Sequence, residues 1–167
     1  MKIFGLAGWS GSGKTTLLEK VLIRLTGQGW KVSTIKHAHH HFDIDKPGKD
    51  SFRHREAGAT EVLVASGRRW ALMHELRDQP EPDLDELLTH MSPVDLLLIE
   101  GFKYHPHPKL EVHRPALEKP LLWPEDSGIV AIATDEPLSG CAIPQLDLND
   151  AHAIADFIVK TAGLSRE

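Results

Sequence analysis

The chain of 167 residues carries 19 basic and 24 acidic residues, and its net charge of -5 argues against a general nucleic-acid-binding protein, because such proteins are normally basic. The single cysteine excludes an internal disulfide framework and is typical of a reducing compartment. No apolar run reaches the roughly 18 residues that a membrane-spanning helix needs, and we expect no signal peptide because a strand is predicted almost at the start of the sequence. We therefore expect one cytoplasmic domain over residues 1–167, with neither nucleic acid nor membrane as partner.

The first predicted element is a short strand, KIFGLAG, over residues 2–8. A helix is predicted from residue 15 onward, because Leu18, Val21, Leu22 and Leu25 lie on one helical face. Between the two lies GWSGSGKT, which matches the pattern G-x-x-x-x-G-K-[ST] in its required place between a strand and a helix. The sequence therefore predicts a phosphate-binding loop.

The residue types of this loop suit the phosphates of a nucleotide. Glycines let backbone N–H groups converge on an anion, and the helix adds its positive dipole end. We expect Lys14 to neutralise the β/γ-phosphates as a catalytic residue and Thr15 to ligate Mg²⁺. Nucleotide contacts are expected from Gly8, Ser10, Gly11, Ser12, Gly13, Lys14, Thr15 and Thr16. The alternative is a Gly-Ser-rich loop that merely turns a strand into a helix, but such a loop needs neither Lys14 nor Thr15.

Strand and helix patterns alternate along the rest of the chain. We predict strands over residues 30–36, 61–65, 69–74, 95–101, 110–113 and 128–133, and helices over residues 51–58, 83–91 and 149–161, the last capped by Asn149. The first two strands and the helix between them form a βαβ unit, which favours a parallel sheet. The fold class is therefore α/β, a P-loop NTPase-like three-layer sandwich with a mainly parallel central sheet and an edge hairpin.

The strand over residues 95–101, DLLLIEG, is nearly continuous in apolar residues and belongs at the centre of the sheet. In open α/β sheets a ligand lies at the carboxyl ends of the strands. Asp95 begins this strand and Glu100 ends it, which places Asp95 roughly 16 Å from the nucleotide end. We expect Glu100 to be the catalytic, metal-side acid, holding Mg²⁺ directly or through water, and Asp95 to cap the start of the strand.

The polar loop KHAHHHFDIDKPGKDS over residues 36–51 leaves the second strand beside the phosphate-binding loop. Its histidines, His37 and His39–His41, are of a type that can bind zinc. A tetrahedral zinc site is not specified by the sequence, however, because the chain has one cysteine and no second cluster of ligands. A solvated loop and a functional loop are the other interpretations, and the position of the loop favours the functional one. In that case we expect nucleotide contacts from His37, Lys49, Asp50 and Arg53, and a metal contact from Asp45.

The phosphate-binding loop, the segments KHAHHHFDIDKPGKDSFRHREAGA and VLVASGRRWALMHE, and DLLLIEGFK together resemble the MobB family of molybdopterin-guanine dinucleotide biosynthesis adapter proteins, over about residues 1–160. The resemblance implies GTP as cofactor with Mg²⁺, weak GTPase activity and a homodimer. It also implies association with the MobA-type guanylyltransferase that joins GMP to molybdopterin. The phosphate-loop residues carry over onto Gly11 to Thr16, and the metal-side acid onto Glu100.

Two departures from related P-loop proteins affect the expected site. Some relatives carry an early loop lysine that reaches across a dimer, and here that position is Trp9, so we expect no such lysine. The guanine-reading pattern N-K-x-D is also missing. The nearest candidate is Asp135, which either accepts two hydrogen bonds from guanine or caps the turn before Pro137.

Three further expectations remain open at the level of sequence. A small-molecule kinase is the alternative function, with Asp45 or Asp50 as the acceptor base. The apolar side chains Trp70, Leu72 and Met73 of the predicted hairpin either form a dimer edge or pack beneath the helix before it. Residues 37–55 and 102–105 are expected to form a wall for a second anionic ligand, with molybdopterin as the candidate.

Overall fold

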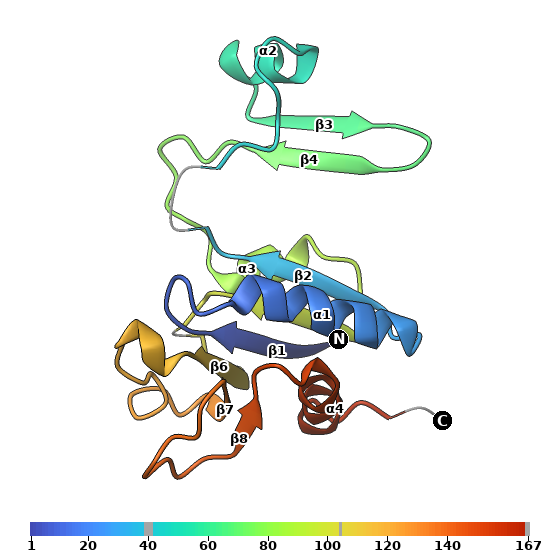
Figure 1. The fold of residues 1–167 in the computed structure, drawn as a ribbon. Coiled ribbons are helices and arrows are strands. Elements are labelled where there is room, and N and C mark those ends of the chain that lie inside the picture. Colours follow the sequence, from blue (N-terminus) through green and yellow to red (C-terminus); the bar gives the residue numbers. More distant parts are fainter. Residues whose placement is uncertain (39–41, 104, 166–167) are drawn as a thin grey trace. The chain divides into compact units, whose positions relative to one another are not determined.

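The structure, a computed structural model, describes residues 1–38, 42–103 and 105–165 (Figure 1). The chain forms two compact units, one built from Met1–His37 with Met91–Glu167 and the other from Ala38–His90. The second unit is thus an insertion between two stretches of the first. The single domain expected over residues 1–167 stays a prediction, and the histidines His39–His41 lie outside the described residues.

The first unit contains a six-stranded sheet. Its strands are β1 (Lys2–Ala7), β2 (Val32–Lys36), β5 (Leu96–Glu100), β6 (Lys109–His113), β7 (Ile129–Thr134) and β8 (Gln145–Asp147). They lie in the order β2-β5-β1-β6-β7-β8, and every described pair is parallel. This arrangement confirms the predicted α/β fold and the position of β5 between two neighbours, whereas the three-residue β8 was not predicted.

One face of this sheet is covered by α1 (Lys14–Gly27) and α4 (Ala151–Thr161). Leu17, Val21 and Leu25 of α1 are buried together with Ile154 and Ile158 of α4 in one hydrophobic cluster. The cap predicted at Asn149 is wrong by one residue: the Asp150 carboxylate accepts the N–H groups of His152 and Ala153, at 3.1 and 2.9 Å. A charged oxygen at the N-cap satisfies these free amides and favours the helix dipole.

The opposite face of β6 carries polar side chains that are buried. Lys109 is 1% exposed and pairs with Asp126 at 2.9 Å, and Glu111 accepts the backbone N–H groups of Leu122 and Trp123 at 2.9 Å each. These bonds fasten residues 114–127, which include the short 3-10 helix η1 (Pro115–Leu117), over this face of the sheet. Buried polar groups are tolerated here because they are paired.

The second unit contains α2 (Asp50–Glu56), β3 (Glu61–Ala65), β4 (Trp70–His74) and α3 (Leu84–Thr89). The predicted hairpin is confirmed, with register pairs from Glu61–His74 to Ala65–Trp70. Its two strands form a sheet of their own, so the predicted position of the hairpin at an edge of the central sheet is wrong. The turn closes locally because the Ser66 N–H donates to the Arg69 carbonyl at 2.9 Å and the Ser66 hydroxyl oxygen accepts the Arg69 N–H at 3.2 Å.

The two faces of the hairpin differ in exposure. The register partners Val62 and Met73 are buried, whereas Leu63 and Leu72, which point to the other face, are 60% and 40% exposed. Trp70 shares that face and is 64% exposed. Of the three apolar residues singled out in the sequence, Met73 therefore packs within the unit, and Trp70 and Leu72 do not.

Within the described part of the chain, no helix has the length and apolar character needed to cross a membrane.

Candidate nucleotide-binding site

The phosphate-binding loop joins the carboxyl end of β1 to the first residue of α1, as its sequence pattern requires. Gly8, Gly11 and Gly13 have positive φ values of 145°, 81° and 98°. A Cβ on Gly8 would lie 2.4 Å from the Val112 carbonyl oxygen, so only glycine fits between β1 and β6. Ser12 is 1% exposed, so its side chain faces the interior of the protein, and the nucleotide contact predicted for Ser12 stays a prediction.

Lys14, the first residue of α1, lies back over the loop. Its Nζ donates to the carbonyl oxygens of Gly8 and Trp9 at 2.9 Å each, which holds the ammonium above the loop. Burial lowers the pKa of Lys14 below its ordinary value, and the nearby Glu100 carboxylate opposes this effect. A partly desolvated ammonium in this position suits a phosphate anion, and the phosphate contact of Lys14 stays a prediction.

Thr15 and Glu100 meet at the carboxyl edge of the sheet. The Thr15 hydroxyl donates to the Glu100 carboxylate, with Oγ1 lying 3.2 Å from Oε1 and 3.3 Å from Oε2, and Lys36 Nζ lies 3.8 Å from Oε1. Glu100 is 8% exposed. Asp95 lies at the other end of β5, where its carboxylate accepts the Lys31 N–H at 2.8 Å. The placement of both acids agrees with the sequence-based expectation.

His37 borders the same acid. Its backbone N–H donates to the Glu100 carbonyl at 2.8 Å, and its ring stacks on Phe102 with 4.5 Å between the centroids. A Cβ on Gly101, whose φ is 107°, would lie 2.6 Å from the Cβ of His37, so glycine permits this close approach. Of the predicted residues in the second loop, His37 belongs to the unit that carries the phosphate-binding loop.

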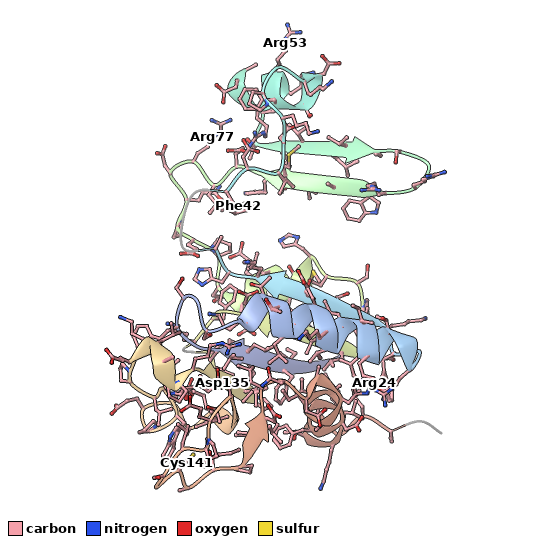
Figure 2. All side chains as sticks on the ribbon, in the orientation of Figure 1. Arg24, Phe42, Arg53, Arg77, Asp135 and Cys141 are labelled. Carbon is pink, nitrogen blue, oxygen red and sulfur yellow. The ribbon has the colours of Figure 1, made fainter. Side chains whose placement is uncertain are left out.

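Arg114 is a residue of the site that the sequence reasoning missed. Its Nε donates to the Ser12 carbonyl at 3.1 Å, and its Nη1 forms a short ion pair with the Asp135 carboxylate. Asp135 follows β7 and is labelled in Figure 2. Arg114 follows β6, so the order of the parallel strands brings both residues to the edge where the phosphate-binding loop lies. No motif in the sequence links residues 12, 114 and 135.

The other predicted contacts lie in the second unit. The Asp45 carboxylate accepts the Ser51 hydroxyl at 2.9 Å and lies 3.4 Å from the Arg55 Nε. Lys49 and Asp50 stand at the start of α2, and Arg53 projects from this helix into solvent (Figure 2). The roles of Asp45, Lys49, Asp50 and Arg53 at the nucleotide stay predictions. Among residues 1–38, 42–103 and 105–165, no three His, Cys, Asp or Glu side chains group as metal ligands.

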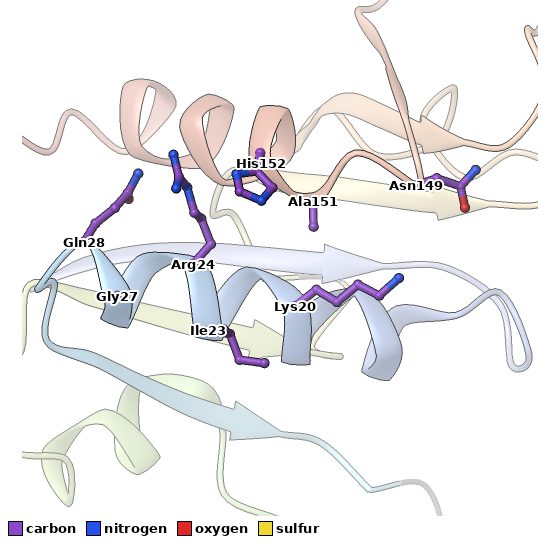
Figure 3. A pocket seen from close by; sticks show the side chains of 8 residues that line it. All are labelled: Lys20, Ile23, Arg24, Gly27, Gln28, Asn149, Ala151 and His152. Carbon is purple, nitrogen blue, oxygen red and sulfur yellow. The ribbon is translucent and has the colours of Figure 1, made fainter.

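A hollow of about 540 Å³ lies between α1 and α4, away from the loop (Figure 3). It is lined by Lys20, Ile23, Arg24, Gly27, Gln28, Asn149, Ala151 and His152. Figure 3 shows Arg24 and Gln28 extending from α1 toward α4. Because no residue of the phosphate-binding loop lines this hollow, it is separate from the candidate nucleotide site.

Comparison with known proteins gives the family. The family model described as "Molybdopterin guanine dinucleotide synthesis protein B", MobB, matches residues 3–135. The molybdopterin-guanine dinucleotide biosynthesis adapter protein of Escherichia coli (strain K12) is 44% identical over 161 residues, covering 95% of this chain and 91% of that protein. The adapter protein of Haemophilus influenzae is 46% identical over 160 residues, covering 93% and 86%.

Solved structures agree with this result. The crystal structure of a MobB protein homolog from Bacillus stearothermophilus matches with a TM-score of 0.74 at 27% identity, covering 99% of this chain and all (100%) of that one. The Bacillus subtilis MobB structure also gives a TM-score of 0.74 at 27% identity, covering 96% and 97%. The chain belongs to the MobB family.

Proposed function

We propose that this protein is a GTP-binding adapter in molybdopterin-guanine dinucleotide biosynthesis that assists the MobA-type guanylyltransferase. The names of the two bacterial relatives support the pathway and the adapter role. The phosphate-binding loop supports a nucleoside triphosphate as ligand. The choice of GTP over other nucleotides rests on the resemblance to the family.

The observation that supports nucleotide binding most directly is the contact between Thr15 and Glu100 beside Lys14. A hydroxyl oxygen and a carboxylate are hard oxygen ligands of the kind that Mg²⁺ prefers, so this pair fits the metal that accompanies a nucleotide. Thr15 and Glu100 would hold Mg²⁺, which neutralises phosphate charge when it is bound. Lys14 would supply the second positive charge, and the loop backbone would hold the phosphates in place.

Hydrolysis by this site is proposed to be slow. GTPases that hydrolyse efficiently use a residue such as glutamine to orient the attacking water. In the first unit, Gln28 lies at the far end of α1 from the loop and Gln145 begins β8, where its amide bonds Leu138. Neither of these two glutamines is placed to orient a water molecule at the phosphates.

The homodimer is proposed to form through the exposed face of the β3–β4 hairpin. Leu63, Trp70 and Leu72 make a contiguous apolar surface on that face, because Leu63 pairs with Leu72 in register and Trp70 lies two residues before Leu72. Exposed apolar surface on a two-stranded sheet favours association. A second copy of the chain is the occupant that the resemblance implies.

Among the contacts of the described residues, none favours the alternative of a small-molecule kinase. Its candidate acceptor bases, Asp45 and Asp50, belong to the second unit, and Asp45 is engaged by Ser51 and Arg55. Incubation with GTP and molybdopterin separates the two functions: a phosphorylated product would favour the kinase, and release of inorganic phosphate alone would favour the adapter.

Isothermal titration with Mg-GTP and Mg-ATP tests nucleotide binding directly. We expect GTP to bind, and we expect Lys14→Ala to weaken binding at least roughly a hundredfold while the fold is kept, because a charged hydrogen-bonding partner of the phosphates is lost. Lys20→Ala, an exposed lysine further along the same helix, is the matched control. Absence of GTP binding at millimolar nucleotide would reject the proposal.

A further inference from the structure

A second hollow in the first unit borders the phosphate-binding loop. It has a volume of about 330 Å³ and is lined by Ala7, Trp9, Lys103, Leu122, Glu125, Asp126 and Ser127. This volume lies at the lower end of the range for small-molecule sites, enough for one bicyclic ring and a short substituent. Trp9 belongs to the loop itself, so the hollow and the loop share a wall.

The hollow lies on the sheet face opposite α1 and α4. Lys109 and Glu111, which point to that opposite face from β6, bind Asp126 and the N–H groups of Leu122 and Trp123. Residues 122–127 are therefore fastened to that face, and with them one side of the hollow. A ligand there would lie behind the loop without occupying the position of the nucleotide phosphates at the start of α1.

The Trp9 indole is held in place as an aromatic wall. Its Nε1–H donates to the Pro120 carbonyl at 2.7 Å. The ammonium of Lys103 lies 4.9 Å from the ring centroid, and that of Lys119 lies 6.0 Å from it. A fixed indole offers a flat surface on which an aromatic ring can stack, and the two ammonium groups beside it favour an anionic substituent on that ring.

The two carboxylates of the hollow differ in availability. Asp126 accepts the Gly128 N–H at 2.8 Å and forms an ion pair with Lys109. These contacts engage both carboxylate oxygens of Asp126. Glu125 is exposed, and its carboxylate has no hydrogen bond or ion pair among residues 1–38, 42–103 and 105–165. Glu125 is thus the acid that can accept two N–H groups from one edge of a ring.

We propose that this hollow binds a 2-amino-4-oxopyrimidine ring, the ring common to pterins and guanine, against the Trp9 indole. Glu125 accepts hydrogen bonds from the ring N–H and the exocyclic amino group, and Lys103 receives a phosphate or other anionic substituent. The inference deepens the proposed function, because it assigns a place for a pterin or guanine ligand beside the bound nucleotide.

Titration calorimetry of the full chain with two matched pairs of probes tests the ring chemistry. Neopterin carries the 2-amino group, whereas the lumazine with the same 6-trihydroxypropyl side chain has an oxo group in its place; GMP and XMP differ in the same way. We expect the amino-bearing probe of at least one pair to bind at least roughly tenfold more tightly than its partner. Preference in the neopterin pair assigns a pterin, and preference in the GMP pair alone assigns guanine.

Variants locate the binding. Glu125→Ala is expected to lower the affinity for the preferred probe at least roughly tenfold. Glu19 is an exposed glutamate on α1, and Glu19→Ala is expected to leave the affinity unchanged. Trp9→Phe keeps an aromatic wall and retains binding, whereas Trp9→Ala reduces it. Equal affinity within both probe pairs, or no effect of Glu125→Ala, would overturn the inference.

The Lys14→Ala variant separates this inference from the proposed function. This variant is expected to lose GTP binding and to keep binding of the preferred ring probe, since the ring lies behind the loop. Loss of both ligands would place the ring in the nucleotide site and overturn the inference. A wild-type protein that binds the ring but not GTP would instead overturn the proposed function alone.

Discussion

Arg114 and Asp135 form an ion pair at the carboxyl edge of the sheet, and the same guanidinium donates to the Ser12 carbonyl of the phosphate-binding loop. One side chain thereby links the ends of β6 and β7 to the loop. A guanidinium suits this task, because its planar fork donates in two directions at once and stays charged. The position of the loop thus depends on two strands that contribute no residue to its sequence motif.

We predict that Arg114→Ala weakens binding of Mg-GTP by roughly tenfold, because the loop loses a charged support. Arg114→Lys is expected to recover only part of the affinity, since an ammonium lacks the fork. Isothermal titration measures both, with Arg24→Ala, in the hollow between α1 and α4, as the control. An Arg114→Ala protein with wild-type affinity would show that the link does not matter for binding.

Glu100→Gln is predicted to raise the Mg²⁺ concentration needed for half-maximal GTP binding at least roughly tenfold, because a neutral amide binds the cation less well. The matched control is Asp95→Asn at the other end of the same strand, where the carboxylate bonds the Lys31 N–H. GTP titrations at graded Mg²⁺ provide the measurement. If the two variants shift the Mg²⁺ dependence equally, Glu100 is not the metal-side acid.

His107 is predicted to make the fold sensitive to acid. Burial, with smaller contributions from Lys109 and His105, lowers the pKa of His107 to about 4, from an ordinary value of 6.5. The unfolded chain therefore binds the proton more readily than the folded protein between these values. The free energy of unfolding is therefore unaffected by His107 above pH 6.5. As the pH falls toward 4, protonation of the unfolded chain lowers this free energy by roughly 3 kcal/mol at most.

Thermal unfolding of wild type and His107→Gln at pH 7 and pH 4.5 measures this effect. The variant is expected to lose less stability on acidification, whereas the exposed His152→Gln control should follow wild type. Burial raises the pKa of Glu111, which acts in the opposite direction, so only the difference between the proteins reports on His107. Identical acid losses in all three proteins would contradict the prediction.

Leu72→Asp is predicted to convert the proposed dimer to a monomer, because it places a charge in the apolar surface formed with Leu63 and Trp70. Sedimentation at tens of micromolar protein is the measurement, with wild type sedimenting as a dimer. Glu61→Asp, at the end of the same hairpin face, serves as the control. A monomeric wild-type protein would reject the dimer itself.

The phosphate-binding loop was predictable because its motif consists of residues that are adjacent in the sequence. Gly8 to Thr16 carry a complete motif, and the direction of strand 95–101 was enough to place Glu100, and not Asp95, beside the loop. Arg114 was not predictable, because its partners Ser12 and Asp135 are distant in sequence and meet only through strand order. Spacing along the chain does not report such contacts.

Elements with weak periodicity were placed less well than the long ones. β8 has three residues, and only its central Leu146 is apolar. The alternation of apolar and polar residues that would predict a strand is therefore missing. Asn149 and Asp150 are both good N-cap residues, and only the helix geometry decides for Asp150. The hairpin was predicted from its alternation and turn, but alternation does not reveal which sheet a hairpin joins.

The insertion of Ala38–His90 between β2 and β5 has a consequence for how this protein can evolve. All six strands of the parallel sheet, the phosphate-binding loop, Glu100 and Arg114 are encoded outside it. Substitutions in the inserted segment therefore leave the sheet, the loop, Glu100 and Arg114 unchanged in sequence. Selection on residues 38–90 can alter the contacts predicted for Asp45, Lys49, Asp50 and Arg53 separately from the phosphate-binding loop.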